Sequence, residues 1–199
     1  MPNHGKILEL ERCPHCAVDR PHLGHKTAFE TSDHTGGFNR LWVMYTCNRC
    51  GGAITAWSNK GSNFIQEMYP APLEVEESIP ERAKAYLEQA ISSISAPAGA
   101  VMLAASSVDA MLKEKGLTDG NLYSRINLAV ENHLITEEMS HWAHEVRLEA
   151  NDQRHSDNSA ALPTAEEAKK LIDFVQALGM FLFVLPSRVE RGIANAQRS

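Results

Sequence analysis

The chain has 199 residues, of which 43% are hydrophobic and 22% charged, a composition typical of globular proteins. It contains no run of 18 apolar residues and its N-terminus lacks an apolar signal core, so we expect a cytoplasmic protein without a membrane-spanning helix. The net charge of −6 argues against a protein that coats nucleic acid without selectivity. This acidity is local, because residues 71–163 carry a net charge of −8 and the segments on either side carry +1 each.

The first 70 residues have the pattern of a small β domain. The runs 41–46 and 53–57 are rich in aromatic and β-branched residues, which is typical of strands, and residues 7–10 are a third candidate. Prolines at positions 70, 72 and 80 indicate a linker over 71–80.

Two Cys-x-x-Cys motifs lie in this β domain: Cys13 with Cys16, and Cys47 with Cys50. Each pair can hold one ion from a tight turn, and two such turns on adjacent hairpins complete the tetrahedral four-thiolate site that suits structural Zn²⁺. A reducing cytoplasm favours a metal site over disulfides. A thioredoxin-like redox pair would account for only one of the two motifs. We therefore predict a zinc ribbon over residues 1–70, with a closed site that leaves no position open for catalysis.

After Pro80 the pattern becomes helical, with five helices expected at about 81–94, 98–115, 120–133, 136–155 and 164–185. Thr164 and Glu167 form a capping-box signature, and Pro186 is expected to end the fifth helix. The apolar run 178–185 is interpreted as core, with Met180 and Phe183 as candidates for a dimer interface. We thus predict an α+β chain that is mainly α: the ribbon, a linker over 71–80, a helical bundle over 81–188 and a tail over 189–199.

The fourth predicted helix carries Arg147, Asn151 and His155 at a spacing of four residues, which places all three on one face. Cationic and imidazole groups on one face can hold a phosphate and transfer protons. An ordinary solvated helix face has the same pattern, so the spacing alone does not choose between the two.

Several segments, in chain order, resemble the bacterial family called domain of unknown function four-one-four-five. They are the two cysteine motifs and residues 86–90, 121–126, 142–144, 147–155 and 183–188. The signature of that family is Arg-x-x-Gly-Asn-x-x-x-His, and here Arg147, Asn151 and His155 match it while Ala150 replaces the glycine. The family in turn resembles the HEPN group of helical bundles, named for nucleotide binding in higher eukaryotes and prokaryotes.

This resemblance implies a HEPN-like bundle, a homodimer and an RNA-directed role in a toxin or antiviral defence system, with RNA or a protein of that system as partner. It also implies a metal-independent endoribonuclease in which the signatures of two copies meet in one cleft. His155 would then act as general base or acid, Arg147 would stabilise charge on the phosphate, and Asn151 would orient His155 or bind a phosphate oxygen.

Two alternatives to catalysis remain open. In the first, the chain is a non-catalytic dimerisation or interaction module, and the ribbon contacts protein or nucleic acid. Trp42, Tyr45, Trp57 and Arg49 can stack on bases in that case, unless the aromatic rings pack in the ribbon core. In the second, both residues are structural: Asn151 caps or bridges helices from a buried position, and His155 ends its helix favourably against the helix dipole.

Overall fold

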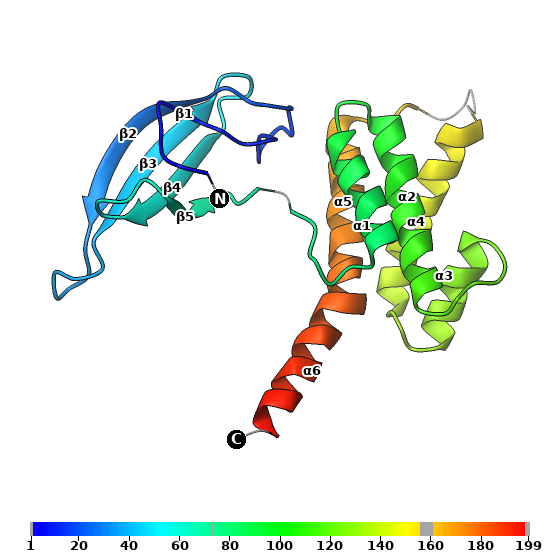
Figure 1. The fold of residues 1–199 in the computed structure, drawn as a ribbon. Helices are drawn as coiled ribbons and strands as arrows, with labels where there is room; N and C mark the ends of the chain where they lie inside the picture. Colours follow the sequence, from blue (N-terminus) through cyan, green and yellow to red (C-terminus); the bar gives the residue numbers. More distant parts are fainter. Residues whose placement is uncertain (1, 73, 156–160, 198–199) are drawn as a thin grey trace. The chain divides into compact units, whose positions relative to one another are not determined.

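The computed structural model describes residues 2–72, 74–155 and 161–197. The chain divides between residues 73 and 74 into two compact units, the first built of strands and the second of helices (Figure 1). The α+β class is therefore confirmed, with helix as the larger part. Over the described ranges, no helix combines the length and the apolar character needed to cross a membrane.

The N-terminal unit is an antiparallel sheet in which the strands follow their chain order. They are β1 (Ile7–Leu8), β2 (Leu23–Thr31), β3 (Arg40–Cys47), β4 (Ala53–Asn59) and β5 (Ile65–Tyr69). Strands were expected near β1, β3 and β4 only. Beyond Leu23, β2 has no buried residue, so it lacks the alternation that identifies a half-buried strand. β5 has five residues and a register shift in its pairing with β4.

One face of this sheet forms the core of the unit. β3 alternates, with Val43, Tyr45 and Cys47 buried and the residues between them half-exposed. Tyr45 pairs with Ile54 of β4, and both are fully buried. The Tyr45 hydroxyl accepts a hydrogen bond from the Gly5 backbone N–H. Side chains of the intervening positions therefore project from the opposite, more exposed face.

The second unit contains α1 (Glu81–Ser92), α2 (Pro97–Glu114), α3 (Leu122–Glu131), α4 (Glu137–His155), α5 (Ala165–Gly179) and α6 (Leu185–Ala196). Helix α2 is the centre of the bundle, because it contacts α1, α3, α4 and α5 (Figure 1). Small buried residues such as Ala100 and Ala104 let its neighbours approach closely. Ser107 is buried in α2 and its hydroxyl donates to the Ala83 carbonyl of α1.

The expectation that Pro186 ends the last helix was wrong. Pro186 lies in the first turn of α6, and residues 189–196 are helical rather than a tail. A π-helical segment, Met180–Val184, joins α5 to α6. Proline lacks an N–H and its ring clashes with the carbonyl four residues earlier in an α-helix. A π turn bonds over five residues instead of four, which lets the proline enter without a break in the helical path.

The apolar run around this π segment is buried on one side only. Leu178, Leu182 and Val184 are buried, whereas Met180 and Phe181 are 43% and 40% exposed. The Lys115 ammonium lies 4.4 Å from the centroid of the Phe183 ring. The interpretation of this run as core therefore holds for Leu178, Leu182 and Val184, whereas Met180 and Phe181 are exposed.

Candidate functional site

Four cysteine thiols converge where β3 turns into β4. Cys13 and Cys16 lie in the turn after β1, Cys47 is the last residue of β3, and Cys50 lies in the turn that follows. All four Sγ atoms lie within 4.8 Å of one another, and those of Cys13 and Cys50 are 3.9 Å apart. Sulfur atoms bound tetrahedrally at a Zn–S distance of about 2.3 Å are about 3.8 Å apart. The cluster therefore has the size and the donor set that Zn²⁺ requires.

The two cysteine turns repeat one backbone pattern. The Ala17 N–H donates to the Cys13 carbonyl, and the Gly51 N–H donates to the Cys47 carbonyl, both at 2.8 Å. Gly51 has a φ of +73°, which favours glycine. A Cβ on Gly52 would lie 2.3 Å from the ring of His15, so a larger residue there would require the His15 side chain to move. In the described parts of the chain, the four cysteines alone form a metal-ligand group of three or more.

The thiols in this cluster perturb one another. Burial raises the pKa of Cys13 to about 12. Burial also raises the pKa of Cys47, but hydrogen bonds from the backbone N–H groups of Cys50 and Arg49 and from neighbouring thiols outweigh it and lower that pKa to about 7. Four thiolates this close repel one another unless a cation lies among them. A divalent ion at this position would hold all four in the deprotonated form.

The exposed face of the sheet carries four aromatic side chains, one from each of β2 to β5. We call Phe29, Trp42, Trp57 and Tyr69 the aromatic face. Phe29 pairs with Trp42, and Trp42 with Trp57, in adjacent strands. The ring of Trp42 lies at the centre, with centroid distances of 6.2 to 6.3 Å to each of the other three. Phe29 and Tyr69 are 50% and 53% exposed.

Hydrogen bonds hold the polar edges of these rings. Trp42 Nε1 donates to Thr31 Oγ1 at 2.9 Å. Trp57 Nε1 and the Tyr69 hydroxyl both donate to Glu67 Oε2. These bonds, that of Tyr69 foremost, hold the pKa of Glu67 below its usual value. The guanidinium of Arg40 lies 4.8 Å from the Trp57 ring centroid, so one cation belongs to the same surface.

The proposed stacking residues divide between three places. Trp42 and Trp57 lie on the aromatic face, Tyr45 is fully buried on the opposite face, and Arg49 is exposed in the second cysteine turn. Core packing is thus the correct interpretation for Tyr45 alone. Phe29 and Tyr69 were missed because their strands were not recognised, and a residue can be assigned to a face only after its strand is known.

The candidate catalytic residues all lie on α4, at intervals of four residues. Arg147 is half-buried, with its guanidinium 5.3 Å from the Tyr123 ring centroid. Asn151 and His155 are exposed, which argues against a buried structural role for Asn151, whereas His155 is the last residue of α4, where a basic group is favourable. Eight residues of helix separate Arg147 from His155 by about 12 Å.

Comparison with known proteins identifies the helical unit. The family model Domain of unknown function (DUF4145) matches residues 80–196, from the start of α1 to the end of α6. The cysteine cluster and the aromatic face lie outside the matched range. No curated protein and no solved structure matches the chain. Because the match covers more than half of its length, the chain belongs to the DUF4145 family.

Proposed function

We propose that this protein acts on RNA in the cytoplasm, as part of a toxin or antiviral defence system, and binds unpaired bases on its aromatic face. The observation that carries the proposal is the contact of one central ring, Trp42, with aromatic rings from three neighbouring strands on an exposed sheet surface. Aromatic side chains on a sheet are a recurrent platform for single-stranded RNA, and each stacked base contributes about 1–3 kcal/mol.

The charge of this surface favours a nucleic acid as ligand. Its exposed rings favour unpaired bases over a duplex. Arg40 supplies a cation beside Trp57, and the carboxylate of Glu67 is occupied by two donors from the same surface. Residues 1–70 carry a net charge of +1, in contrast to −8 in the following segment. Bases inside a duplex are already stacked on one another, so their faces are not free to stack on these rings.

The test measures binding of the full chain to a fluorescently labelled single-stranded RNA and to the same sequence as a duplex. We expect preference for the single strand and a loss of about tenfold or more with Trp42→Ala, because one stacking contact is removed. Phe38→Ala is the matched control, since Phe38 is 77% exposed in the turn before β3 and outside the aromatic face. Unchanged affinity in Trp42→Ala would show that RNA, if bound, lies elsewhere.

A second candidate function is metal-independent RNA cleavage on α4. The exposure of Asn151 and His155 on one helix face with Arg147 favours it. As the family resemblance implies, the signatures of two copies would meet in one cleft, and we propose that the active arrangement takes His155 from one copy and Arg147 from a second. In the reaction the ribose 2′-oxygen loses its proton to His155 and attacks phosphorus. The bond from phosphorus to the 5′-oxygen then breaks, that oxygen takes a proton, and a cyclic phosphate remains.

The experiment for cleavage uses purified full chain, labelled RNA and no added metal, with oligomeric state measured by light scattering. A dimeric nuclease should lose activity in Arg147→Ala and in His155→Ala, and a mixture of the two variants should recover part of it. Cleavage that survives His155→Ala would exclude this site. Absence of cleavage, together with RNA binding that depends on Trp42, would favour the non-catalytic interaction module.

A further inference from the structure

A carboxylate borders the aromatic face on the last strand of the sheet. Glu67 of β5 lies opposite Trp57 of β4, and its side chain is exposed. Its Oε2 accepts hydrogen bonds from Trp57 Nε1 at 3.3 Å and from the Tyr69 hydroxyl at 2.5 Å. Tyr69 is two residues further along the same strand, so both side chains project from the same side of the sheet. Two rings of the aromatic face therefore hold this carboxylate in place.

The polar edges of the rings have no donor left for a ligand. Trp42 Nε1 donates to Thr31 Oγ1. The donors of Trp57 and Tyr69 are both bound to Glu67 Oε2. Among the described residues, none donates a hydrogen bond to the second carboxylate oxygen, Glu67 Oε1. The hydrogen bonds to Oε2, that of Tyr69 foremost, hold the pKa of Glu67 below its usual value, so the group is ionised and only accepts. The face thus presents one free anionic acceptor beside its rings.

Arg40 supplies donors on the same surface. Its guanidinium lies 4.8 Å from the centroid of the Trp57 ring, and its charge contributes to the lowered pKa of Glu67. Over residues 2–72, 74–155 and 161–197, Arg40 forms no ion pair. A base stacked on this part of the face therefore meets a cationic donor and an anionic acceptor at its edge. The pairing edge of a base is free for such contacts only in an unpaired strand.

We infer that Glu67 determines base specificity on the aromatic face and that this face prefers guanine, an inference that rests on the proposed binding of unpaired RNA. Guanine presents two adjacent donors, N1–H and N2–H, on its pairing edge, and one carboxylate oxygen with two lone pairs can accept from both. The guanine O6 acceptor at the other end of this edge suits Arg40. Uracil has a single donor between two carbonyl oxygens, which a carboxylate repels. Adenine and cytosine have one donor group each, so we expect them to bind between these extremes.

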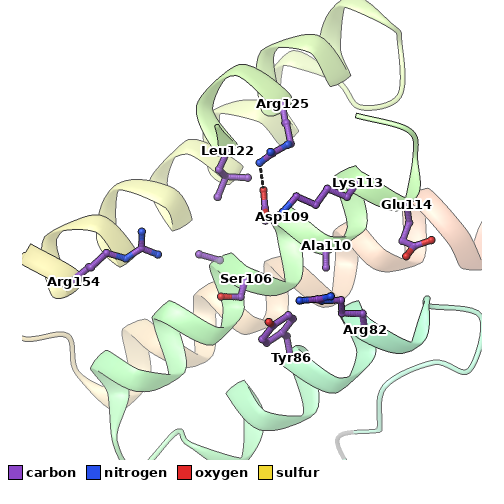
Figure 2. A pocket seen from close by; sticks show the side chains of 11 residues that line it. Arg82, Tyr86, Ser106, Asp109, Ala110, Lys113, Glu114, Leu122, Arg125 and Arg154 are labelled. Atoms are coloured by element: carbon purple, nitrogen blue, oxygen red, sulfur yellow. Dashed lines mark hydrogen bonds and ion pairs between the residues drawn. The ribbon is translucent and has the colours of Figure 1, made fainter. Parts of the chain in front are cut away.

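The helical unit contains a separate cationic surface, a pocket of about 550 Å³ between α1, α2, α3 and α4 (Figure 2). It is lined by one cationic side chain from each of these helices: Arg82, Lys113, Arg125 and Arg154. Asp109 also lines it and pairs with both Lys113 and Arg125. Attraction of an RNA backbone to these cations would act through phosphates, which are the same at every nucleotide. A preference for one base therefore distinguishes the aromatic face from this pocket.

The experiment measures dissociation constants of the full chain for three fluorescently labelled single-stranded RNAs. All three are short uridine strands that differ only in the central nucleotide, which is guanosine, inosine or uridine. Inosine has the ring system of guanosine without the N2 amino group, so stacking is matched and one donor is removed. We expect the guanosine strand to bind about tenfold more tightly than the inosine strand, as for loss of one hydrogen bond to a charged group. The all-uridine strand should bind most weakly.

Glu67→Gln separates base recognition from support of the rings. The amide oxygen can still accept from Trp57 and Tyr69, but the second position becomes an NH₂ donor that does not suit the guanine donors. The preference for guanosine over inosine should therefore disappear. Glu9→Gln is the matched control, because Glu9 is exposed outside the aromatic face and its loss changes the net charge equally. Arg82→Gln is the control for the pocket. Both controls should keep the wild-type preference.

Failure of the proposed function and failure of this inference give different results. If no strand binds, RNA binding by the aromatic face is itself wrong, and the inference falls with it. If binding requires Trp42 but the guanosine and inosine strands are equivalent, the face binds RNA without selecting this base, and only the inference is overturned. A guanosine preference that persists in Glu67→Gln, or an equal loss of affinity for all three strands in that variant, also overturns it.

Discussion

Arg125 of α3 and Asp109 of α2 form an ion pair with an N–O distance of 2.5 Å. Lys113, one turn after Asp109, approaches the other carboxylate oxygen at 2.6 Å. Arg125 also donates to two carbonyls of the segment that joins α2 to α3. One guanidinium thus connects two helices and the loop between them, so the pocket and the packing of α3 depend on the same contact.

Asp109→Ala should destabilise the helical unit by about 3 kcal/mol, because it leaves the buried Arg125 guanidinium without its counter-charge. Lys113→Ala, which removes the exposed partner of the same carboxylate, should cost less than about 1 kcal/mol. Urea unfolding followed by circular dichroism at 222 nm measures both. Equal effects of the two substitutions would show that Arg125 finds a replacement partner.

The cysteine cluster predicts one zinc ion per chain. Removal of the ion should unfold the N-terminal unit and leave the helical signal at 222 nm intact, since the two units have separate cores and a structural zinc site contributes about 10–16 kcal/mol to folding in small domains. Cys50→Ser, which changes an exposed ligand, should lose the metal in elemental analysis. His22→Ala is the control for an exposed ligand-type residue nearby. A full zinc equivalent in Cys50→Ser would place the ion elsewhere.

Thr164 caps helix α5. Its Oγ1 accepts from the Glu167 N–H, while the Glu167 carboxylate accepts from the Thr164 backbone N–H at 2.7 Å. Thr164→Ala should cost about 1 kcal/mol in urea unfolding, and Thr164→Ser should cost little because serine keeps the acceptor. If alanine and serine give the same stability, the cap adds nothing beyond what water provides at this helix end.

Local signals account for the parts of the fold that could be predicted from sequence. Each cysteine pair occupies a single turn, and the cap at Thr164 needs only Glu167 three residues later, so short spacing is sufficient evidence. The passage of the helix through Pro186 could not be predicted from local spacing, because it involves the π turn Met180–Val184, in which Leu182 and Val184 are buried. Proline then occupies a position that suits it instead of ending the helix.

The pocket could not be predicted for a different reason. Arg82, Arg125 and Arg154 belong to three helices, and each alone has the pattern of a solvated or paired surface cation. Arg154 directly precedes His155 on α4. Successive residues on a helix point in directions about 100° apart, so Arg154 points toward α2 and α3 while His155 points away. Cations that are distant in sequence come together only when the helices pack, so no spacing pattern in the sequence predicts their convergence.

His144 on α4 predicts a pH dependence of stability. Its Nε2 is hydrogen-bonded to Asn127 Oδ1 at 3.0 Å, and its ring centroid lies 4.9 Å from that of Tyr123. Burial, foremost, and the nearby charges of Arg147 and His141 lower its pKa. The folded state therefore favours the neutral ring, whereas an unfolded histidine takes up a proton near pH 6.5. The stabilisation from this ring is complete above about pH 6.5 and is lost as the pH falls through that value toward the lowered folded pKa.

The measurement compares urea unfolding of wild type and His144→Gln at pH 7.5 and pH 5.5, with the helical signal at 222 nm as readout. Glutamine keeps a polar group within reach of Asn127 but does not titrate, so wild type should lose more stability on acidification than the variant does. The difference between the two slopes isolates His144 from the other groups that titrate in this range. Equal slopes would mean that the ring becomes protonated in the folded state as readily as in the unfolded chain, and that the Asn127 contact tolerates the charged form.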